Sequence, residues 1–439
     1  MTIPSFTGYQ TALSGLEAAQ AAIDTTGQNI ANANTPGYTR QVVNTAEAPS
    51  LGIPAFNQEG GTTDLGTGVD VTSITRIRDQ FLDVQYRAQN TAASNANTNA
   101  SELAQVQTAV NEPSTNGIQA QMSKFWGAWS SLANDPTSPA AKQAVIDDGQ
   151  TLAGTFNSVY GQMSTVQSQA ATQYGSLTGA NGSVEQDAQQ IATLNGQITT
   201  ATEAGQTPNN LLDQRDNLLD QLSSLAQVSV TSESDGSVTV GFGDASTPLV
   251  SGTTVTWPQT LTAAAGGQLG ALYSLSSTAP SGTIQQYLDS LANVATQVTG
   301  AVNALQPSSP FFAGTLGSPT NPLTVSATPA SIQTSSSSTS GPDLAQQIAD
   351  LNGGTGDQDY GAFVAQLGNG VQSAQSTQAT AQAVLTAVSN QRQSVSGVSL
   401  DQEMTNLINF QQAYQASARV MNAMDQALNS LITSVGAGL

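Results

Sequence analysis

Three aspartates that share one helix face are the residues of this chain best placed to do chemistry. Asp213, Asp216 and Asp220 lie at positions i, i+3 and i+7, so their carboxylates point the same way from a helix. Carboxylates in this arrangement can act as acid and base or bind Ca²⁺. Arg215 lies beside them and the helix is otherwise amphipathic, which favours a charged surface in contact with solvent. We predict a solvated acidic face, without a catalytic or metal-binding role.

Two further patterns resemble ligand sites only in part. Residues 357–361 begin like a calcium loop, but Gly361 and Gly368 stand at the fifth and twelfth positions, where oxygen ligands are needed. Residues 66–68, Gly-Thr-Gly, lack the third glycine of a dinucleotide fingerprint. We therefore expect no metal, cofactor or phosphate site.

Arg76, Arg78 and Arg87 form the only marked concentration of positive charge. Arginine pairs with carboxylates in a bidentate geometry. In so acidic a chain, the three arginines indicate either a contact between subunits or salt bridges within one chain.

The composition excludes most enzyme chemistry. The 439 residues include no Cys and no His, which removes disulfides, thiolate nucleophiles and every catalytic triad that needs His. Only carboxylate-based hydrolysis remains, and no pair of acids across a cleft is evident. Lys and Arg number 9 against 30 Asp and Glu, for a net charge of −21, which argues against nucleic acid or anionic membranes as partners. We also expect no Sec signal and no membrane span.

Helical periodicity is strongest at the two ends of the chain. An N-terminal helix ending near Asn34 is predicted from an apolar seam, and residues 35–38 then suit a type II turn. The seam comprises Tyr9, Leu13, Leu16, Ile23 and Ile30. A C-terminal helix of 36 residues, about 54 Å long, carries a second seam. Its positions are Leu400, Met404, Leu407, Gln411, Tyr414, Ala418, Met421, Asp425, Leu428, Ile432 and Val435. We expect the two ends to pair, and to become ordered fully only among neighbouring subunits.

The middle of the chain alternates between helical and strand patterns. Residues 42–75 are rich in Gly and Pro and are interpreted as a long, partly ordered excursion. Helices are predicted at 117–133, where an aromatic stripe indicates core packing, across most of 138–204, and at 208–226. A hairpin with a two-residue turn is expected at Asp235-Gly236, and an uninterrupted apolar seam predicts a helix at 284–305.

The predicted fold class is mainly α with a smaller β-rich part. Long terminal helices would form a coiled-coil-like bundle, and a central β-rich domain would lie outside it. The predicted divisions are 1–35 with 400–439 as the terminal helical domain, 36–227 with 343–399 as a mainly helical rod, and 228–342 as the β-rich outer domain. The last includes the helix at 284–305 and a loop rich in Ser, Thr and Pro.

The two ends also resemble a known family. The runs at 14–20 and 29–41 are similar to the N-terminal signature of bacterial flagellar rod, hook and hook-associated proteins, and those at 396–403 and 410–420 resemble its C-terminal half. Within this group, the sequences at 210–219 and 400–403 are most similar to those of the members found at the hook–filament junction. The N-terminal residues that the motif marks for assembly are Ser14, Gly15, Leu16, Ile23, Asn29, Ile30, Asn32, Asn34, Pro36, Gly37, Tyr38, Arg40 and Gln41. The C-terminal ones are Leu400, Asp401, Glu403, Leu407, Phe410, Gln411, Tyr414, Ala418, Val420, Leu428 and Ile432.

The resemblance implies a structural role and not an enzymatic one. Such a protein would be secreted through the flagellar type III apparatus, with an export chaperone on its C-terminal helix, and would self-associate in a tubular lattice. Its other partners would be the hook protein and a second hook-associated junction protein. The alternatives are a distal rod or hook subunit of the same group, or a secreted coiled-coil adhesin.

Overall fold

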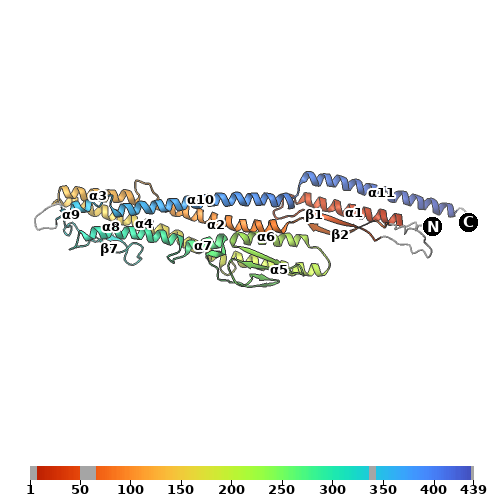
Figure 1. The fold of residues 1–439 in the computed structure, drawn as a ribbon, viewed down its shortest axis with the longest axis horizontal. Helices are drawn as coiled ribbons and strands as arrows, with labels where there is room; N and C mark the ends of the chain where they lie inside the picture. Colours follow the sequence, from red (N-terminus) through yellow and green to blue (C-terminus); the bar gives the residue numbers. More distant parts are fainter. Residues whose placement is uncertain (1–6, 50–65, 336–342, 437–439) are drawn as a thin grey trace, which may run out of the picture.

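The chain forms a long rod whose terminal helices lie together at one end. The computed structural model describes residues 7–49, 66–335 and 343–436. Both termini, α1 (Thr7–Ala31) and α11 (Leu400–Gly436), lie at the right-hand end of Figure 1, while α3 (Ile118–Asn134), α9 (Asp343–Ala349) and β7 (Phe312–Ala313) lie at the other end. The predicted pairing of the two chain ends is confirmed, because α1 packs against α11.

Four long helices make up the body of the rod. These are α2 (Gln80–Val110), α4 (Pro139–Thr178), α8 (Thr283–Ala304) and α10 (Thr355–Ser396). The 42 residues of α10 run along α2 and α8, which joins segments far apart in the chain. The predicted helices at 117–133 and 284–305 are confirmed as α3 and α8. The calcium-like stretch at 357–361 is helical and lies in the first turns of α10.

The core of the rod is built on aromatic side chains, as the stripe at 117–133 predicts. Phe125, Trp129 and Phe311 are all 0% exposed. The ring centroids of Phe125 and Phe311 are 5.5 Å apart, and those of Trp129 and Phe311 are 5.6 Å apart, within the range of favourable aromatic pairs. The apolar seam of α8 is buried in the same core. This part of the molecule therefore completes its core within one chain.

A second, smaller core lies on the side of the rod. Helices α5 (Ser183–Glu203) and α6 (Asn209–Leu225) cover an antiparallel sheet in the order β3-β4-β5-β6. Its strands are β3 (Val228–Ser232), β4 (Val238–Phe242), β5 (Val250–Ser251) and β6 (Thr254–Val255). This unit stands out from the rod below α6 in Figure 1.

The predicted hairpin between β3 and β4 is present, but its turn is longer than the predicted two residues. The amide of Glu233 donates to the carbonyl of Ser237 at 2.9 Å, and that of Gly236 donates to the carbonyl of Glu233 at 3.2 Å. Three residues therefore form the loop, with Gly236 in the left-handed region at φ 84°. A type I turn followed by a left-handed Gly is the usual three-residue solution.

The structure divides the predicted outer domain, 228–342, between the two cores. Its strands belong to the smaller core, whereas α8, β7 and β8 (Thr324–Val325) pack in the core of the rod. Helix α7 (Gly267–Ser276) lies between them, against α2 and α4. The reason is that α8 packs against α4 and α10, which bring its seam into the core of the rod, and its own spacing does not reveal these partners. Residues 336–342 of the predicted Ser-rich loop lie outside the described residues.

The predicted excursion at 42–75 is a two-stranded antiparallel sheet where the structure describes it. Strand β1 (Gln41–Glu47) pairs with β2 (Val69–Arg76), with a register shift at Asn44; residues 50–65 lie outside the described part. Helix α1 ends at Ala31, slightly earlier than predicted, and the predicted turn at 35–38 is confirmed by Gly37 at φ 80°. No helix among the described residues is long and apolar enough to cross a membrane.

Candidate assembly interface

Helices α1 and α11 form an antiparallel pair with a regular register. A Cβ on Gly8 would meet Cε of Met424, and one on Gly15 would stand 3.1 Å from Oγ of Ser417. Two heptads further along α1, Nδ2 of Asn29 donates to Oε2 of Glu403. The contacts thus advance along α1 by the same number of residues as they retreat along α11, which keeps the helices side by side for about 32 Å.

The face of α1 that is buried is not the predicted apolar seam. Small residues occupy the contact with α11 and the sheet, because they allow the backbones to approach closely. The buried members of α1 are Thr7, Ala12, Ala18, Ala19, Ala22, Thr25, Thr26 and Asn29. Of the predicted seam, Leu16, Ile23 and Ile30 are half-buried and Leu13 is 37% exposed. The predicted periodicity is correct, but a single chain does not cover that face.

The predicted seam of α11 is divided in the same way. Five of its members are half-buried, namely Leu407, Tyr414, Ala418, Met421 and Leu428. Gln411 and Asp425 are exposed. Large apolar side chains remain open to solvent at Leu400 (48%), Met404 (54%) and Ile432 (66%).

A buried polar knot joins the base of this helix pair to the sheet. The side chain of Asn29 is only 1% exposed. Its Nδ2 donates to the Gln41 carbonyl at 2.9 Å and to Oε2 of Glu403 at 3.1 Å. Its Oδ1 accepts from the Gln41 amide at 3.0 Å and from the Tyr38 hydroxyl at 2.8 Å. Every hydrogen-bonding position of this amide is therefore satisfied. Arg40 adds a guanidinium 3.8 Å from Glu403.

The environment of this knot keeps the Tyr38 phenol protonated. Burial, assisted by the negative charges of Asp213 and Glu403, raises the pKa of Tyr38 to about 12. The hydroxyl therefore remains a hydrogen-bond donor to Asn29 at neutral pH. Five residues that the family motif marks, Asn29, Tyr38, Arg40, Gln41 and Glu403, are brought together here although they come from both ends of the chain.

Next to the polar knot lies a cluster of four arginines and four aspartates, which we name the joint cluster. Its members are Arg76, Arg78, Arg87, Arg392, Asp83, Asp213, Asp216 and Asp220. Arg76 contacts Asp213 at 2.7 Å and Asp216 at 2.8 Å. Arg87 contacts Asp220 at 3.0 Å, and Arg392 of α10 contacts the same carboxylate at 2.6 Å. The cluster thereby connects β2, α2, α6 and α10.

The predicted solvated face of Asp213, Asp216 and Asp220 is wrong. Their side chains are only 10%, 16% and 15% exposed, because α6 packs against the arginines that follow β2. The open question about Arg76, Arg78 and Arg87 is answered at the same time, since all three make salt bridges within the chain. No group of three or more acidic residues with metal-ligand geometry occurs in the described ranges.

Mutual pairing holds the joint cluster in its ionised form. Burial alone would raise the pKa of Asp216, but Arg78, Arg76 and Arg87 outweigh it and the pKa is lowered. Burial opposes the charge of Arg78 too, yet the carboxylates of Asp216 and Asp83 raise its pKa. Carboxylates that are already paired in this way are not free to act as a base, so the arrangement supports positioning and not catalysis.

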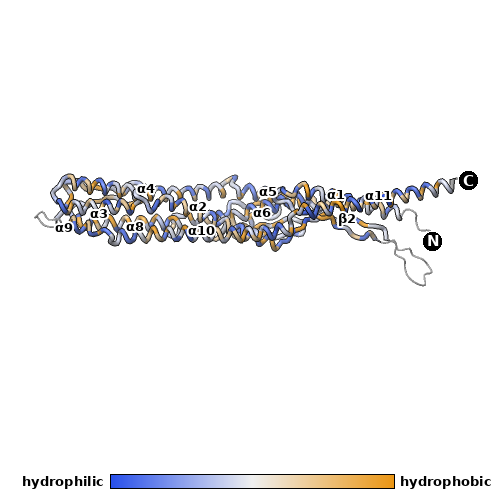
Figure 2. Tube along the Cα trace, turned by 90° about the horizontal axis from the view of Figure 1, so that it is seen from above, coloured by the Kyte–Doolittle hydropathy of each residue, from blue (hydrophilic) through white to orange (hydrophobic). Residues whose placement is uncertain are grey.

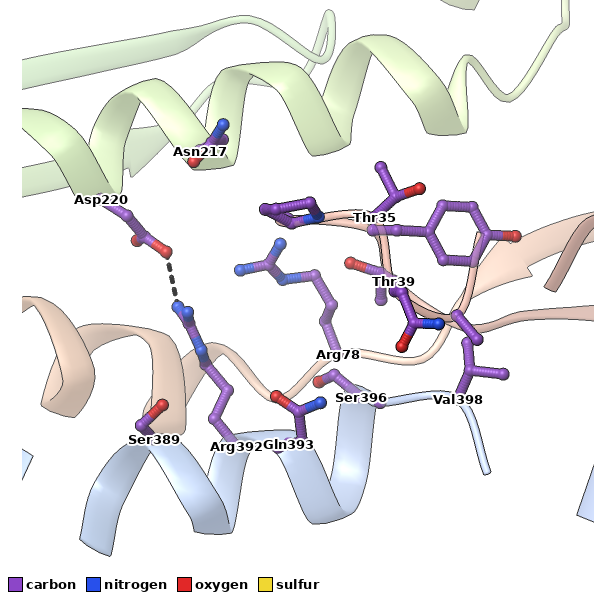
Figure 3. A pocket seen from close by; sticks show the side chains of 16 residues that line it. Thr35, Thr39, Arg78, Asn217, Asp220, Ser389, Arg392, Gln393, Ser396 and Val398 are labelled. Atoms are coloured by element: carbon purple, nitrogen blue, oxygen red, sulfur yellow. Dashed lines mark hydrogen bonds and ion pairs between the residues drawn. The ribbon is translucent and has the colours of Figure 1, made fainter. Parts of the chain in front are cut away.

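A polar cavity of about 290 Å³ marks the point where the terminal pair joins the rod (Figure 3). Figure 3 shows that Thr35 and Thr39 of the turn, Asn217 of α6 and Gln393 of α10 line this cavity, with the ion pair between Arg392 and Asp220 on one side. The Arg40 amide donates to the Ser396 carbonyl at 3.0 Å nearby. The turn, α6 and the end of α10 are thus held at one joint.

The other motif residues lie along the helix pair and its turn. The hydroxyl of Ser14 accepts from the Val69 amide at 3.2 Å, and Asn32 donates to the Gln28 carbonyl at the end of α1. Several motif residues face solvent, namely Asn34, Pro36, Gly37, Asp401 and Val420. Phe410 is half-buried.

The sequence reasoning missed Asp83 and Arg392 as partners in the joint cluster. A signal was available, because four of the nine basic residues of the chain lie in this cluster. Arg392 is 172 positions from Asp220, however, so spacing could not connect them.

Comparison with known proteins gives a consistent picture. Residues 103–264 match the family described as the flagellar hook-associated protein FlgK helical domain. Residues 10–39 match the flagella basal body rod protein family, and 389–434 match the flagellar basal body rod FlgEFG protein C-terminal family.

Individual relatives carry the same name. Flagellar hook-associated protein 1 of Bacillus subtilis (strain 168) is 30% identical, over 99% of this chain and 99% of its own length. The protein of that name from Escherichia coli (strain K12) is 33% identical over 52% of this chain, and the match spans only 40% of the relative. The solved flagellar hook junction protein FlgK from Burkholderia pseudomallei is 28% identical, with a TM-score of 0.45 over 51% of this chain and 43% of that one.

The match to the Bacillus protein extends over 99% of both chains, and the terminal family matches include most of α1 and most of α11. The chain therefore belongs to the flagellar hook-associated protein 1 family, the structural subunits of the hook–filament junction of the bacterial flagellum.

Proposed function

We propose that this chain builds the junction by self-association of the α1–α11 pair into a tubular lattice. The observation that carries the proposal is the contrast in burial: the rod buries Phe125, Trp129 and Phe311 completely, whereas α11 buries only Glu403 among its described side chains. Burying apolar surface against neighbours would supply the free energy that an isolated pair lacks. Figure 2 shows hydrophobic positions recurring along both terminal helices.

Each segment of the chain would have its own role in the proposed assembly. The segments 1–35 and 400–439 would form the inner assembly unit, and the motif residues of α1, the turn and α11 would contact neighbours. The rod, 36–227 with 343–399 and joined by α8, β7 and β8, would extend from it, and the sheet of the smaller core would face outward. The position of that sheet on one side of the rod supports this arrangement (Figure 1).

The partners of the proposed assembly are proteins. Neighbouring copies would be joined by the hook protein on one side and a second hook-associated junction protein on the other, and an export chaperone would cover α11 before secretion. No enzymatic activity is proposed, since the carboxylates of the joint cluster are paired with arginines. The net charge of −21 disfavours nucleic acid as a ligand.

Deletion of the gene in its source organism tests the proposal. Electron microscopy of the cells should show complete hooks without filaments, and flagellin should accumulate in the medium. Cells without hooks would instead place the protein in the rod or hook, and normal filaments would favour an adhesin. Complementation with the unaltered gene controls for effects on neighbouring genes.

A further inference from the structure

The terminal helix pair contains a groove that no side chain of the described chain fills. It encloses about 300 Å³ between α1, the β1–β2 sheet and α11. Small residues of α1, such as Ala19 and Ala22, line it together with Val43 of β1 and Phe410 of α11. We name this the terminal groove. Because its lining is mostly apolar, its exposure to water is unfavourable.

Gln41 lines the groove and is held in place from behind. It is only 5% exposed, its backbone bonds to Asn29, and its Oε1 accepts from Asn209 at 3.3 Å. This side of the groove is therefore fixed by the polar knot.

The same chain presents an exposed apolar surface of similar length on α11. Leu400, Met404 and Ile408 are 48%, 54% and 52% exposed and follow one another at four-residue spacing. We name them the terminal ridge. The ridge is about 12 Å long, and the groove extends for about 15 Å along α11, from Glu403 to Ala413.

The ridge and the groove cannot meet within one molecule. They lie roughly 140° apart around α11 and at the same level along it. A second copy placed beside the first, with little displacement along the helix, would bring the ridge of one copy to the groove of the next. Such a contact joins two different surfaces and therefore repeats around a tube instead of stopping at a dimer.

This chain itself supplies an occupant of the required chemistry, since the ridge is exposed, apolar and about as long as the groove. Copies that each carry −21 repel one another, so they associate best through surfaces without net charge. The ridge consists of three uncharged side chains. Among the described residues that line the groove, Glu403 alone is charged, and it already contacts Asn29 and Arg40.

We propose that the terminal ridge of one subunit inserts into the terminal groove of its lateral neighbour. This inference rests on the proposed self-association and specifies its contact. It predicts a directional interface, in which ridge and groove come from different copies.

Disulfide cross-linking tests the contact directly, because the chain has no Cys of its own. Cells would produce one copy with Ile408→Cys and one with Val43→Cys, and isolated hook–filament structures would be treated with a mild oxidant. A disulfide forms only when the Cβ atoms come within about 4.5 Å. We expect cross-linked dimers from the mixed pair at least tenfold above either variant alone.

The matched control replaces Ile408→Cys with Asn409→Cys, an exposed neighbour on another face of α11. Incorporation without cross-linking, or equal cross-linking by the Asn409→Cys pair, would overturn the ridge-and-groove contact while the proposed function stands. Failure of the unaltered chain to incorporate would instead refute the proposed function.

A second measurement does not depend on the introduced cysteines. The variant Met404→Glu with Ile408→Glu places two charges on the ridge, and Gln402→Glu with Asn409→Glu places two charges beside it. We expect the first variant to reduce incorporation at least tenfold and the second to leave it within twofold of the unaltered chain. Equal incorporation of the two variants would contradict the proposal.

Discussion

The rod and the terminal helix pair have similar helical periodicity, but their apolar side chains are covered to different extents. In the rod, apolar side chains meet partners from the same chain, and Phe125, Trp129 and Phe311 are fully buried. In the terminal pair, small residues make the internal contact and large apolar residues lie at its edges. The difference teaches that a helical seam predicts a packing surface but does not say whether the packing partner belongs to the same molecule.

The joint cluster lies at the boundary between these two regions. Its four arginines and four aspartates balance in charge and connect the start of the rod to the segments that lead into α1 and α11. A paired network of this kind is directional, so it favours one orientation of the connected elements. Buried charges require their partners, which makes this boundary sensitive to loss of a single member.

Removal of an aromatic ring from the rod should have the largest effect on stability. Trp129→Ala is expected to lower the free energy of unfolding by about 3–5 kcal/mol, since it leaves a cavity in a complete core. Chemical denaturation followed by circular dichroism measures this change. Phe81→Ala, at a side chain that is 73% exposed, serves as the control and should change stability by about 0.5 kcal/mol or less. Equal effects would mean that the rod core is not complete within one chain.

Loss of one carboxylate from the joint cluster should be nearly as costly. Asp216→Asn leaves Arg76, Arg78 and Arg87 short of a partner and should destabilise the chain by about 3 kcal/mol at pH 7. Because the folded-state pKa of Asp216 is lowered, its contribution is present above the unfolded pKa of about 4 and is lost as pH falls through the folded value. The midpoint temperature of thermal unfolding should therefore fall more steeply from pH 7 to pH 3 for the unaltered chain than for Asp216→Asn. Parallel curves would refute this account.

Charges placed on the terminal pair should separate assembly from folding. Leu407→Asp with Tyr414→Asp is expected to abolish incorporation into the flagellum while the rod unfolds within about 1 kcal/mol of the unaltered chain, because neither side chain belongs to its core. Immunodetection on isolated hooks and denaturation of the purified protein measure the two effects. Normal incorporation of this double variant would contradict the proposed role of α11.

The smallest expected effect concerns the smaller core. Burial raises the pKa of Asp187 in α5 to about 6, so its protonated form favours the folded state, and this contribution is lost as pH rises from about 4 to about 6. Asp187→Asn should therefore stabilise the chain at pH 8 by about 1 kcal/mol, a value reduced for partial solvent screening. The gain should disappear at pH 4, and a constant gain at both pH values would exclude this explanation.

Several elements could be predicted because their information is local. The seam of α8, the aromatic stripe of α3 and the turn at Gly37 each depend on residues close together in the chain. The length of α10 was not predicted as one helix, because its many Gln, Ser, Thr and Ala residues do not form a continuous apolar stripe. The boundary of the outer domain failed for a related reason, since the partner of α8 lies in distant helices.

The amino-acid sequence by itself determined which reaction types are excluded and which family this protein resembles. Absence of Cys and His excludes reaction types without reference to any fold, and the terminal motifs are contiguous runs of residues. Only the tertiary structure decided which face of α1 is buried, which arginines neutralise Asp213, Asp216 and Asp220, and where the groove opens beside Gln41. Spacing along one helix defines a face, but the element that covers that face comes from elsewhere in the chain, and its arrival depends on the packing of the whole molecule.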